Sequence, residues 1–260
     1  MIDLEQRALM AERSTWDFDW TPPGFESIDR PDVFAWSYES PWAGSRGVAR
    51  ATWRDEEIDE RLPDVAAFFA QRPGRPYRWY VGPSTTSSAL SRLVAARARG
   101  VHAPRMMTAE LDPVRFSSKA VVDVREVTPG ALVRQVHDAA FPEDTVERRE
   151  LAVKEQDAYL SGGRRGGQLA AFVEDELVGF ASWRDSADGC CVELVGGWTK
   201  PSHRRRGIYS ALSAYRCDRA RERGRRYAVV VADPTSSGPV LDRAGFIDHG
   251  PLYIYHDVRL

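Results

Sequence analysis

A short basic run around one glycine is the part of this chain best suited to bind an anionic group. The run is Arg204-Arg205-Arg206-Gly207, and from Ile208 onward apolar residues recur at the spacing of a helical face. The first turn of a helix leaves backbone N–H groups unpaired and carries the positive end of the helix dipole. Gly207 would let phosphate oxygens approach the backbone without meeting a Cβ. The segment therefore predicts a phosphate-binding turn at a helix start.

The residues before the turn predict a buried strand that would support it. Residues 192–199 are apolar around Gly196 and Gly197, and Pro201 ends the strand because proline cannot donate to a central ladder. A Walker A loop would need Gly-Lys-Ser/Thr here, and a dinucleotide fingerprint would need G-x-G-x-x-G. Neither motif is present at this turn. The alternative to a phosphate site is a solvated basic turn.

A family resemblance rests on these residues. Arg204-x-x-Gly207-x-Tyr209 resembles the R/Q-x-x-G-x-G/A pyrophosphate loop of the GNAT N-acetyltransferases, which bind acetyl-coenzyme A. The sequence departs from that loop at Tyr209, where the family usually has Gly or Ala. Two flanking segments also resemble the family, namely Thr199-x-Pro201 and Val240-Leu-Asp-Arg-Ala-Gly-Phe246.

The resemblance covers residues 121–260 well and the first half faintly. It implies an α/β (α+β) GNAT fold, with a central mixed sheet flanked by helices. The first half repeats the same order of elements, but its corresponding helix start, Arg54-Asp-Glu-Glu-Ile58, is acidic and would repel a pyrophosphate. We therefore expect a degenerate GNAT-like domain without a cofactor loop at residues 1–115, and an acetyl-CoA-binding domain at residues 120–260. An unrelated α/β cap is the alternative for the first half.

The resemblance also implies which residues meet acetyl-CoA. Backbone N–H groups of the central strand would steady the thioester oxyanion, and the glycines would leave room for the pantetheine arm. The implied cofactor-binding residues are Gly197, Trp198, Thr199, Arg204, Arg205, Arg206, Gly207, Ile208, Tyr209 and Ser210.

Glu193 is the candidate general base. It lies eleven residues before Arg204, where the histone-acetyltransferase branch of the family carries its basic glutamate. Its apolar neighbours would desolvate the carboxylate, which raises its pKa toward the operating range. The alternative is a glutamate at the strand edge that points to water.

The general acid departs from the family pattern. The family places a tyrosine four residues before the Gly-Phe pair, and this chain has Leu241 there. Coenzyme A could leave as a thiolate without help, because a thiol with a pKa near 8.5 is a fair leaving group. The tyrosines that could replace the missing acid are Tyr209, Tyr215, Tyr253 and Tyr255. We take Tyr209 as the second catalytic candidate, and we expect Leu241→Tyr to raise turnover or leave it unchanged.

Composition limits the other functions. The net charge of −2 gives no global attraction to nucleic acid or to anionic lipid. No apolar run approaches the roughly 20 residues of a membrane helix. Three cysteines do not make a disulfide framework, and no C-x-x-C or H-x-x-x-H spacing supports a metal site.

Together these features predict a cytoplasmic bacterial acetyl-CoA-dependent N-acetyltransferase. The acceptor would be an amine of a small molecule or a protein that attacks the thioester directly, with neither nucleic acid nor membrane as partner. A homodimer is compatible with this prediction. The alternative is a non-catalytic acyl-CoA-binding sensor, which the leucine at position 241 favours.

Overall fold

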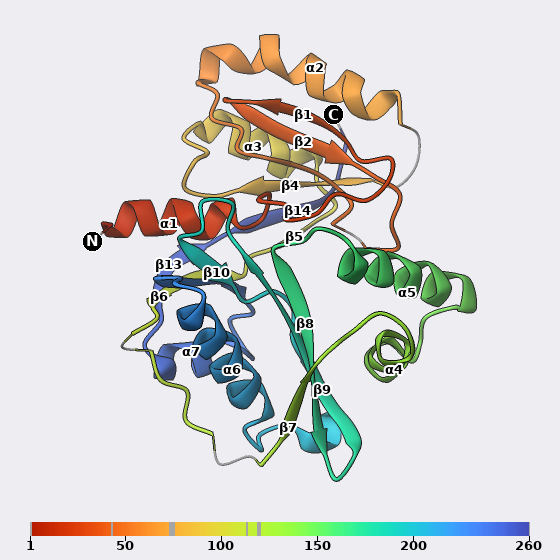
Figure 1. Ribbon diagram of the computed structural model, residues 1–260. Helices are drawn as coiled ribbons and strands as arrows, with labels where there is room; N and C mark the ends of the chain where they lie inside the picture. The colour runs from red at the N-terminus through yellow and green to blue at the C-terminus, as the bar shows by residue number, and fades with distance from the viewer. Residues whose placement is uncertain (1, 43, 73–75, 113, 119–120, 260) are drawn as a thin grey trace.

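Two β-sheets, each flanked by helices, form the frame of the molecule (Figure 1). The structure is a computed structural model that describes residues 2–42, 44–72, 76–112, 114–118 and 121–259. The first half of the chain forms α1 (Leu4–Arg13), β1 (Glu26–Arg30), β2 (Val33–Ser37), β3 (Arg46–Ala49), the 3₁₀ turn η1 (Asp55–Glu57), α2 (Ile58–Ala70), β4 (Tyr77–Val81), α3 (Ser88–Arg97), β5 (Gly100–His102) and β6 (Arg105–Glu110).

The second half contains the predicted phosphate turn and more helical residues. It forms β7 (Asp123–Glu126), α4 (Ala131–Ala140), α5 (Val146–Ser161), β8 (Gly166–Val173), β9 (Glu176–Asp185), β10 (Cys191–Glu193), β11 (Trp198–Thr199), η2 (Pro201–His203), α6 (Ile208–Glu222), β12 (Tyr227–Ala232), α7 (Gly238–Ala244), β13 (Ile247–Pro251) and β14 (Tyr253–Val258).

Each half places its last strand in the sheet of the other half. The first sheet has the order β1-β2-β3-β4-β14-β5, and the second has the order β13-β6-β12-β10-β9-β8-β7. Strand β14 pairs antiparallel with β4 and β5, and β6 pairs antiparallel with β12 and β13. The exchange is therefore reciprocal, and each sheet needs a strand from the other half to complete its backbone hydrogen bonds.

The two sheets share one layout. Among the described strands, each sheet has a single parallel pair, β3 with β4 and β10 with β12, and a helix connects the two members. The connecting helices are α2 and α6. In each sheet the exchanged strand lies next to the second member of the pair. The like order of elements that the sequence indicated is thus present in the tertiary structure.

A core shared by both halves holds the two sheets together. Helix α1 of the first half packs on β6 and β12 of the second sheet. Buried side chains from both halves meet in this core, including Met10, Trp36, Met106, Tyr227 and Ile254. On the other face of the second sheet, Val192 and Leu194 pack in a separate cluster with residues of α6 and α7. The relative position of the halves is therefore set by buried apolar contacts.

Several sequence expectations need correction. The sequence did not reveal the strands β1, β5 and β13. The predicted strand at 192–199 is divided into β10 and β11. The glycine-rich segment 162–167 ends in β8, where a Cβ at Gly166 would collide with the Tyr159 hydroxyl. Near the expected boundary between the two domains, Pro113 and residues 119–120 lie outside the described residues.

Candidate active site

The central strand separates from its parallel neighbour and leaves an opening in the second sheet. Strand β10 pairs with β12 as far as Glu193, and the Leu194 N–H donates to the Val229 carbonyl at 2.9 Å. Within the described residues, β11 then pairs with β9 alone, whereas the end of β12 pairs with β6. Gly196 has a φ of +55°, which interrupts the extended backbone between β10 and β11. The opening therefore lies between β11 and β12.

Unpaired backbone donors lie at this opening. Gly196 and Gly197 are exposed, and their N–H groups donate to no backbone acceptor in the described part of the chain. The neighbouring Val195 carbonyl, in contrast, accepts the Ser182 N–H at 3.0 Å. Oriented N–H groups of this kind stabilise an oxyanion that develops nearby. Gly197 therefore brings an unpaired backbone donor to the gap in the strand pairing, next to the Tyr209 ring.

The predicted phosphate turn leads into α6. Gly207 is the N-cap with a left-handed φ of +85°, no side chain caps the helix, and the first turn carries no acidic residue. The N–H groups of this first turn, at Ile208, Tyr209 and Ser210, are therefore open to an anion. Arg204, Arg205 and Arg206 precede the cap and are all exposed. The Arg204 Nε donates to the Thr199 carbonyl at 3.3 Å, which ties the turn to β11.

Tyr209 lies between the helix and the opening. A Cβ at Gly197 would lie 3.4 Å from the Tyr209 ring. The hydroxyl of Tyr209 interacts with Arg216, which lies two turns further along the helix on its buried side. Tyr209 therefore contacts both a residue of the central strand and a buried cation.

Arg216 is a site residue that the sequence reasoning missed. It is 1% exposed, and it donates to the carbonyls of Ser182 at 2.8 Å and Val195 at 3.4 Å. Burial lowers the pKa of Arg216, and Tyr209 opposes that shift. Arg216 thus holds the backbone that leads into the opening. The sequence does contain a signal for its burial, because Arg216 follows Leu212 by four residues and so lies on the apolar face of α6.

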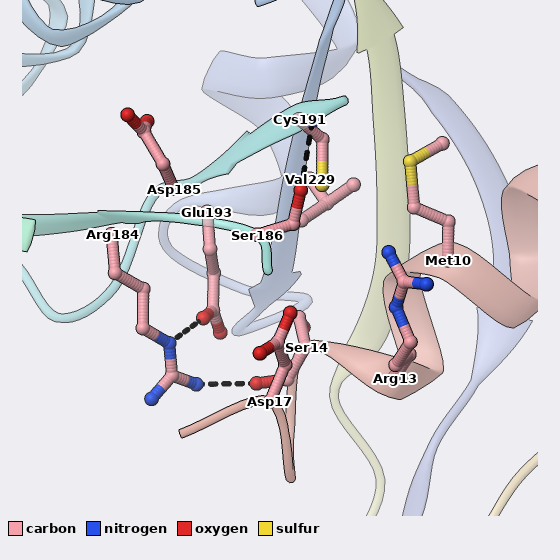
Figure 2. Close-up of a pocket in the computed structure, with 10 residues that line it drawn as sticks. All are labelled: Met10, Arg13, Ser14, Asp17, Arg184, Asp185, Ser186, Cys191, Glu193 and Val229. Carbon is pink, nitrogen blue, oxygen red and sulfur yellow. Dashed lines mark hydrogen bonds and ion pairs between the residues drawn. The ribbon is translucent and has the colours of Figure 1, made fainter. Parts of the chain in front are cut away.

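Glu193 lies in a small cavity whose lining residues are drawn in Figure 2. Its neighbours Val192 and Leu194 pack with α6, so Glu193 lies on the opposite face of the sheet. Arg184 donates its Nε–H to Glu193 and its Nη2–H to the Ser14 carbonyl. The cavity measures about 10 Å³, which is the volume for one water molecule at most. Burial raises the pKa of Glu193, although Arg184 opposes this. The cavity is therefore too small to hold an amine substrate beside the carboxylate.

The structure thus separates the two catalytic candidates. Tyr209 lies at the opening with the cofactor candidates, whereas Glu193 lies behind the N-terminal segment. Leu241 is 0% exposed in the core cluster that also contains Leu194 and Val230. Tyr253 and Tyr255 lie on β14 in the first sheet, and Tyr215 packs against Arg219.

The corresponding position in the first half is filled with side chains. Trp53 follows β3 and Trp79 lies on β4, and both indoles are buried with their ring centroids 6.1 Å apart. The helical segment that follows begins with Asp55, Glu56 and Glu57. The first half therefore presents aromatic bulk and negative charge where the second half has its opening and basic turn.

The remaining basic residues of α6 and the following turn are engaged within the chain. Arg219 and Arg221 pair with Glu222 and Asp218, and Arg223 and Arg225 pair with Asp185. In the described residues, no group of histidine, cysteine and acidic side chains is placed to hold a metal ion. None of the described helices combines the length and hydropathy needed to cross a membrane.

Comparisons with known proteins agree with this geometry. Residues 133–246 match the profile of the Acetyltransferase (GNAT) family. A GCN5-related N-acetyltransferase from Kribbella flavida is similar in structure, with a TM-score of 0.68, 17% identity, and coverage of 98% of this chain and 94% of that chain. A functionally unknown conserved protein from Staphylococcus epidermidis has a TM-score of 0.68 and 15% identity, over 91% of this chain and 95% of that chain.

A tandem GNAT protein from the clavulanic acid biosynthesis pathway has a TM-score of 0.61 and 13% identity, with coverage of 98% of this chain and 95% of that chain. A sequence search of the curated proteins finds no match. The family match contains the opening and the basic turn, and the similar structures extend over both sheets. The chain therefore contains a GNAT acetyltransferase domain within residues 133–246, and its two-sheet layout is consistent with two GNAT-like halves.

Proposed function

We propose that the second half binds acetyl-CoA and transfers its acetyl group to the nitrogen of an amine by direct attack. One observation carries the proposal, namely that the opening between β11 and β12 lies beside the uncapped start of α6. An opening lined by free N–H groups suits an extended thioester arm, and an uncapped helix start with a basic turn suits a pyrophosphate. All three cysteines are free thiols, in keeping with the proposed cytoplasmic location.

The proposed contacts follow the order of the chain. The pyrophosphate would meet the N–H groups of residues 208–210 and the side chains of residues 204–206, while Gly207 provides close approach. The pantetheine arm would run along Gly197, Trp198 and Thr199 toward Gly196. The free N–H groups of the two glycines fit a thioester oxygen, because they have no competing backbone acceptor in the described residues.

The chemistry then needs one bond formed and one broken. The neutral amine nitrogen attacks the thioester carbonyl carbon, the carbon–sulfur bond breaks, and the amine loses one proton as the amide forms. Tyr209 is the proposed proton donor to the thiolate, and the neighbouring Arg216 would stabilise the phenolate that remains. Glu193 is the proposed proton acceptor for the amine, and this role requires the segment around Ser14 to move.

The turn can be tested with two isosteric substitutions at Gly207. Asparagine and aspartate both tolerate the left-handed backbone that this position requires, and they differ mainly in charge. We expect Gly207→Asp to abolish acetyl-CoA binding in calorimetry, because its carboxylate would occupy the helix start and repel the pyrophosphate. Gly207→Asn should retain most of the affinity. Equal affinities for wild type and Gly207→Asp would refute the site.

A matched control exists at the end of the same helix. Gly224 also has a positive φ, of +76°, and a Cβ there would meet nothing within 4 Å. Gly224→Asp introduces the same charge and the same backbone strain far along α6 from the turn. It should leave acetyl-CoA affinity unchanged.

A non-catalytic acyl-CoA sensor is the second candidate function. It is favoured by the small cavity around Glu193 and by the burial of Leu241 where the family has a tyrosine. Acetyl-CoA binding without turnover across a broad amine panel would support the sensor. Release of free coenzyme A that depends on an added amine would support the enzyme.

A further inference from the structure

A row of four aromatic side chains runs from the proposed thioester site to the junction of the two halves. The rings are those of Trp198, Phe180, Phe141 and Trp42, in this order along the row. Adjacent ring centroids are 6.3, 6.4 and 5.3 Å apart, and all four side chains are half-buried. A continuous apolar row of partly accessible rings is suited to bind a ligand with an apolar body.

The row begins at the opening and ends on the first half. Trp198 lies on β11 and faces Phe180 of β9 in register. Phe141 follows the end of α4, and Trp42 lies in the segment between β2 and β3. Phe180 packs with the cluster of α4 and α5, which is on the face of the sheet that α6 does not cover. A molecule that approaches the thioester from this face passes along the four rings.

A carboxylate without a cationic partner lies at the end of the row. Glu155 of α5 accepts a hydrogen bond from the Ser40 hydroxyl at 2.7 Å. The Ser40 oxygen in turn accepts a hydrogen bond from the backbone N–H of Trp42 at 3.2 Å. No arginine or lysine among residues 2–42, 44–72, 76–112, 114–118 and 121–259 forms an ion pair with Glu155. Burial raises the pKa of this carboxyl, and Ser40 opposes the shift. A cationic ligand would supply the missing counter-charge.

An unpaired polar atom gives independent support for a ligand on this face. Gln168 of β8 lies opposite Ser182 in the sheet, and Ser182 is two residues from Phe180 and so on the same face. Gln168 is 8% exposed, and its Oε1 has no hydrogen-bond partner in the described structure. A buried amide oxygen without a donor is costly. The N–H of a bound amine would satisfy it.

We propose that the acceptor is an amine with an aromatic or apolar body and a separate cationic group at its far end, bound along this row between the two halves. The proposal rests on the proposed acetyl transfer, and it adds the substrate class. The apolar body contacts Trp42 and Phe141, and Glu155 attracts the cationic group, so the nitrogen that is acetylated lies at the other end of the acceptor, toward Trp198. The first half thereby contributes Trp42 and Ser40 to acceptor recognition.

The test compares three amines by calorimetry, with and without coenzyme A. The probes are 2-phenylethylamine, ethanolamine, which lacks the apolar body, and the polycation spermidine. We expect 2-phenylethylamine to bind at least about tenfold more tightly than either other amine, as burial of an aromatic ring predicts. Trp42→Ala should weaken its binding about tenfold through the loss of stacking and cation–π contact. Glu155→Gln should weaken it about fivefold, because a charged hydrogen bond becomes neutral.

Two control variants match these changes. Trp20 is also half-buried and contacts Tyr159 rather than the row, and Glu150 lies on the exposed side of α5 with Arg134. Trp20→Ala and Glu150→Gln should leave amine affinity unchanged. If Trp42→Ala and Glu155→Gln match these controls, or if ethanolamine or spermidine binds as tightly as 2-phenylethylamine, the proposal is wrong.

The two proposals fail separately. If acetyl-CoA binds and amines are acetylated, but the variants of Trp42 and Glu155 keep the wild-type preference, only the acceptor proposal falls. If 2-phenylethylamine binding depends on both residues while acetyl-CoA does not bind, the acetyl-transfer proposal falls and the amine site stands.

Discussion

Arg184 links Glu193 on the central strand to the Ser14 carbonyl at the end of α1, so one guanidinium joins the second sheet to the N-terminal segment. Burial lowers the pKa of Arg184, but the charge and hydrogen bond of Glu193, together with Asp19 and Tyr159, outweigh burial and the pKa is raised. The hydrogen bonds of Arg184 to Glu193 and to Ser14 hold the proposed base in place and also close its cavity. A catalytic and a structural role for Glu193 therefore have to be separated by experiment.

A pair of variants separates these roles. Glu193→Gln leaves Arg184 buried without a counter-charge, which should cost about 3–5 kcal/mol of unfolding free energy. Glu193→Gln with Arg184→Met removes both charges and should recover most of that loss. If Glu193 is the base, kcat/KM should fall about 10²–10⁴-fold in both variants, and the acidic limb of its pH profile should disappear. Activity that returns with stability in the double variant would make Glu193 structural.

The reciprocal strand exchange predicts that neither half folds alone. Separately produced residues 1–115 would lack β14 between β4 and β5, and residues 120–260 would lack β6 between β12 and β13. Each fragment would expose unpaired strand edges, which promote aggregation. We expect both fragments to lack a cooperative thermal transition, and their co-expression to give one soluble complex. A fragment of 120–260 that folds and binds acetyl-CoA by itself would contradict this prediction.

The burial of Leu241 in the structure changes the result expected for Leu241→Tyr from the one that the sequence alone suggested. The side chain is 0% exposed in a packed cluster, so a tyrosine would overfill the core and bury a hydroxyl. We expect a loss of about 1–3 kcal/mol in urea unfolding and no gain in turnover. Leu241→Met, which conserves the volume, should cost less than about 1.5 kcal/mol. Higher turnover at full stability would show that this position does face the thioester.

His137 predicts a loss of stability in mild acid. Burial lowers its pKa below the ordinary value of 6.5, although Asp144 opposes the shift. The folded protein then binds a proton at His137 less readily than the unfolded chain does. The contribution of neutral His137 to the free energy of unfolding is therefore complete above pH 6.5 and is lost as the pH falls toward the lowered pKa. Urea midpoints should therefore fall less for His137→Phe than for wild type between about pH 7.5 and 5.5. His102→Phe, at an exposed position, should behave as wild type.

The two halves also predict one acetyl-CoA per chain. Among the residues that the structure describes, only the second half combines an opening with a basic turn, while Trp53 and Trp79 fill the matching place in the first half. Calorimetric titration should give a stoichiometry of one, and Gly207→Asp should abolish all binding. Residual binding of one equivalent in that variant would place a second site in the first half.

Features that depend on neighbouring residues can be read from the amino-acid sequence. Ser87 is a residue type that favours the start of a helix, and its hydroxyl accepts a hydrogen bond from the Leu90 N–H. Glu174 and Asp175 lie between two apolar stretches of the sequence, and both have the positive φ of a tight turn. The turn at Gly207 is present for the same reason. Capping, turn formation and helical spacing act over a few residues, so their signals are readable without the fold.

The tertiary structure alone decided which distant residues meet. The alternation of β14 is the same whichever sheet it enters, so its exchange into the first sheet leaves no mark in the pattern. Glu193 looked like a desolvated base, but Arg184 and Ser14 decide its contacts and accessibility. Trp42 meets Phe141 across almost 100 positions of the chain. Such pairings arise from the packing of separate elements, and local propensity contains no information about them.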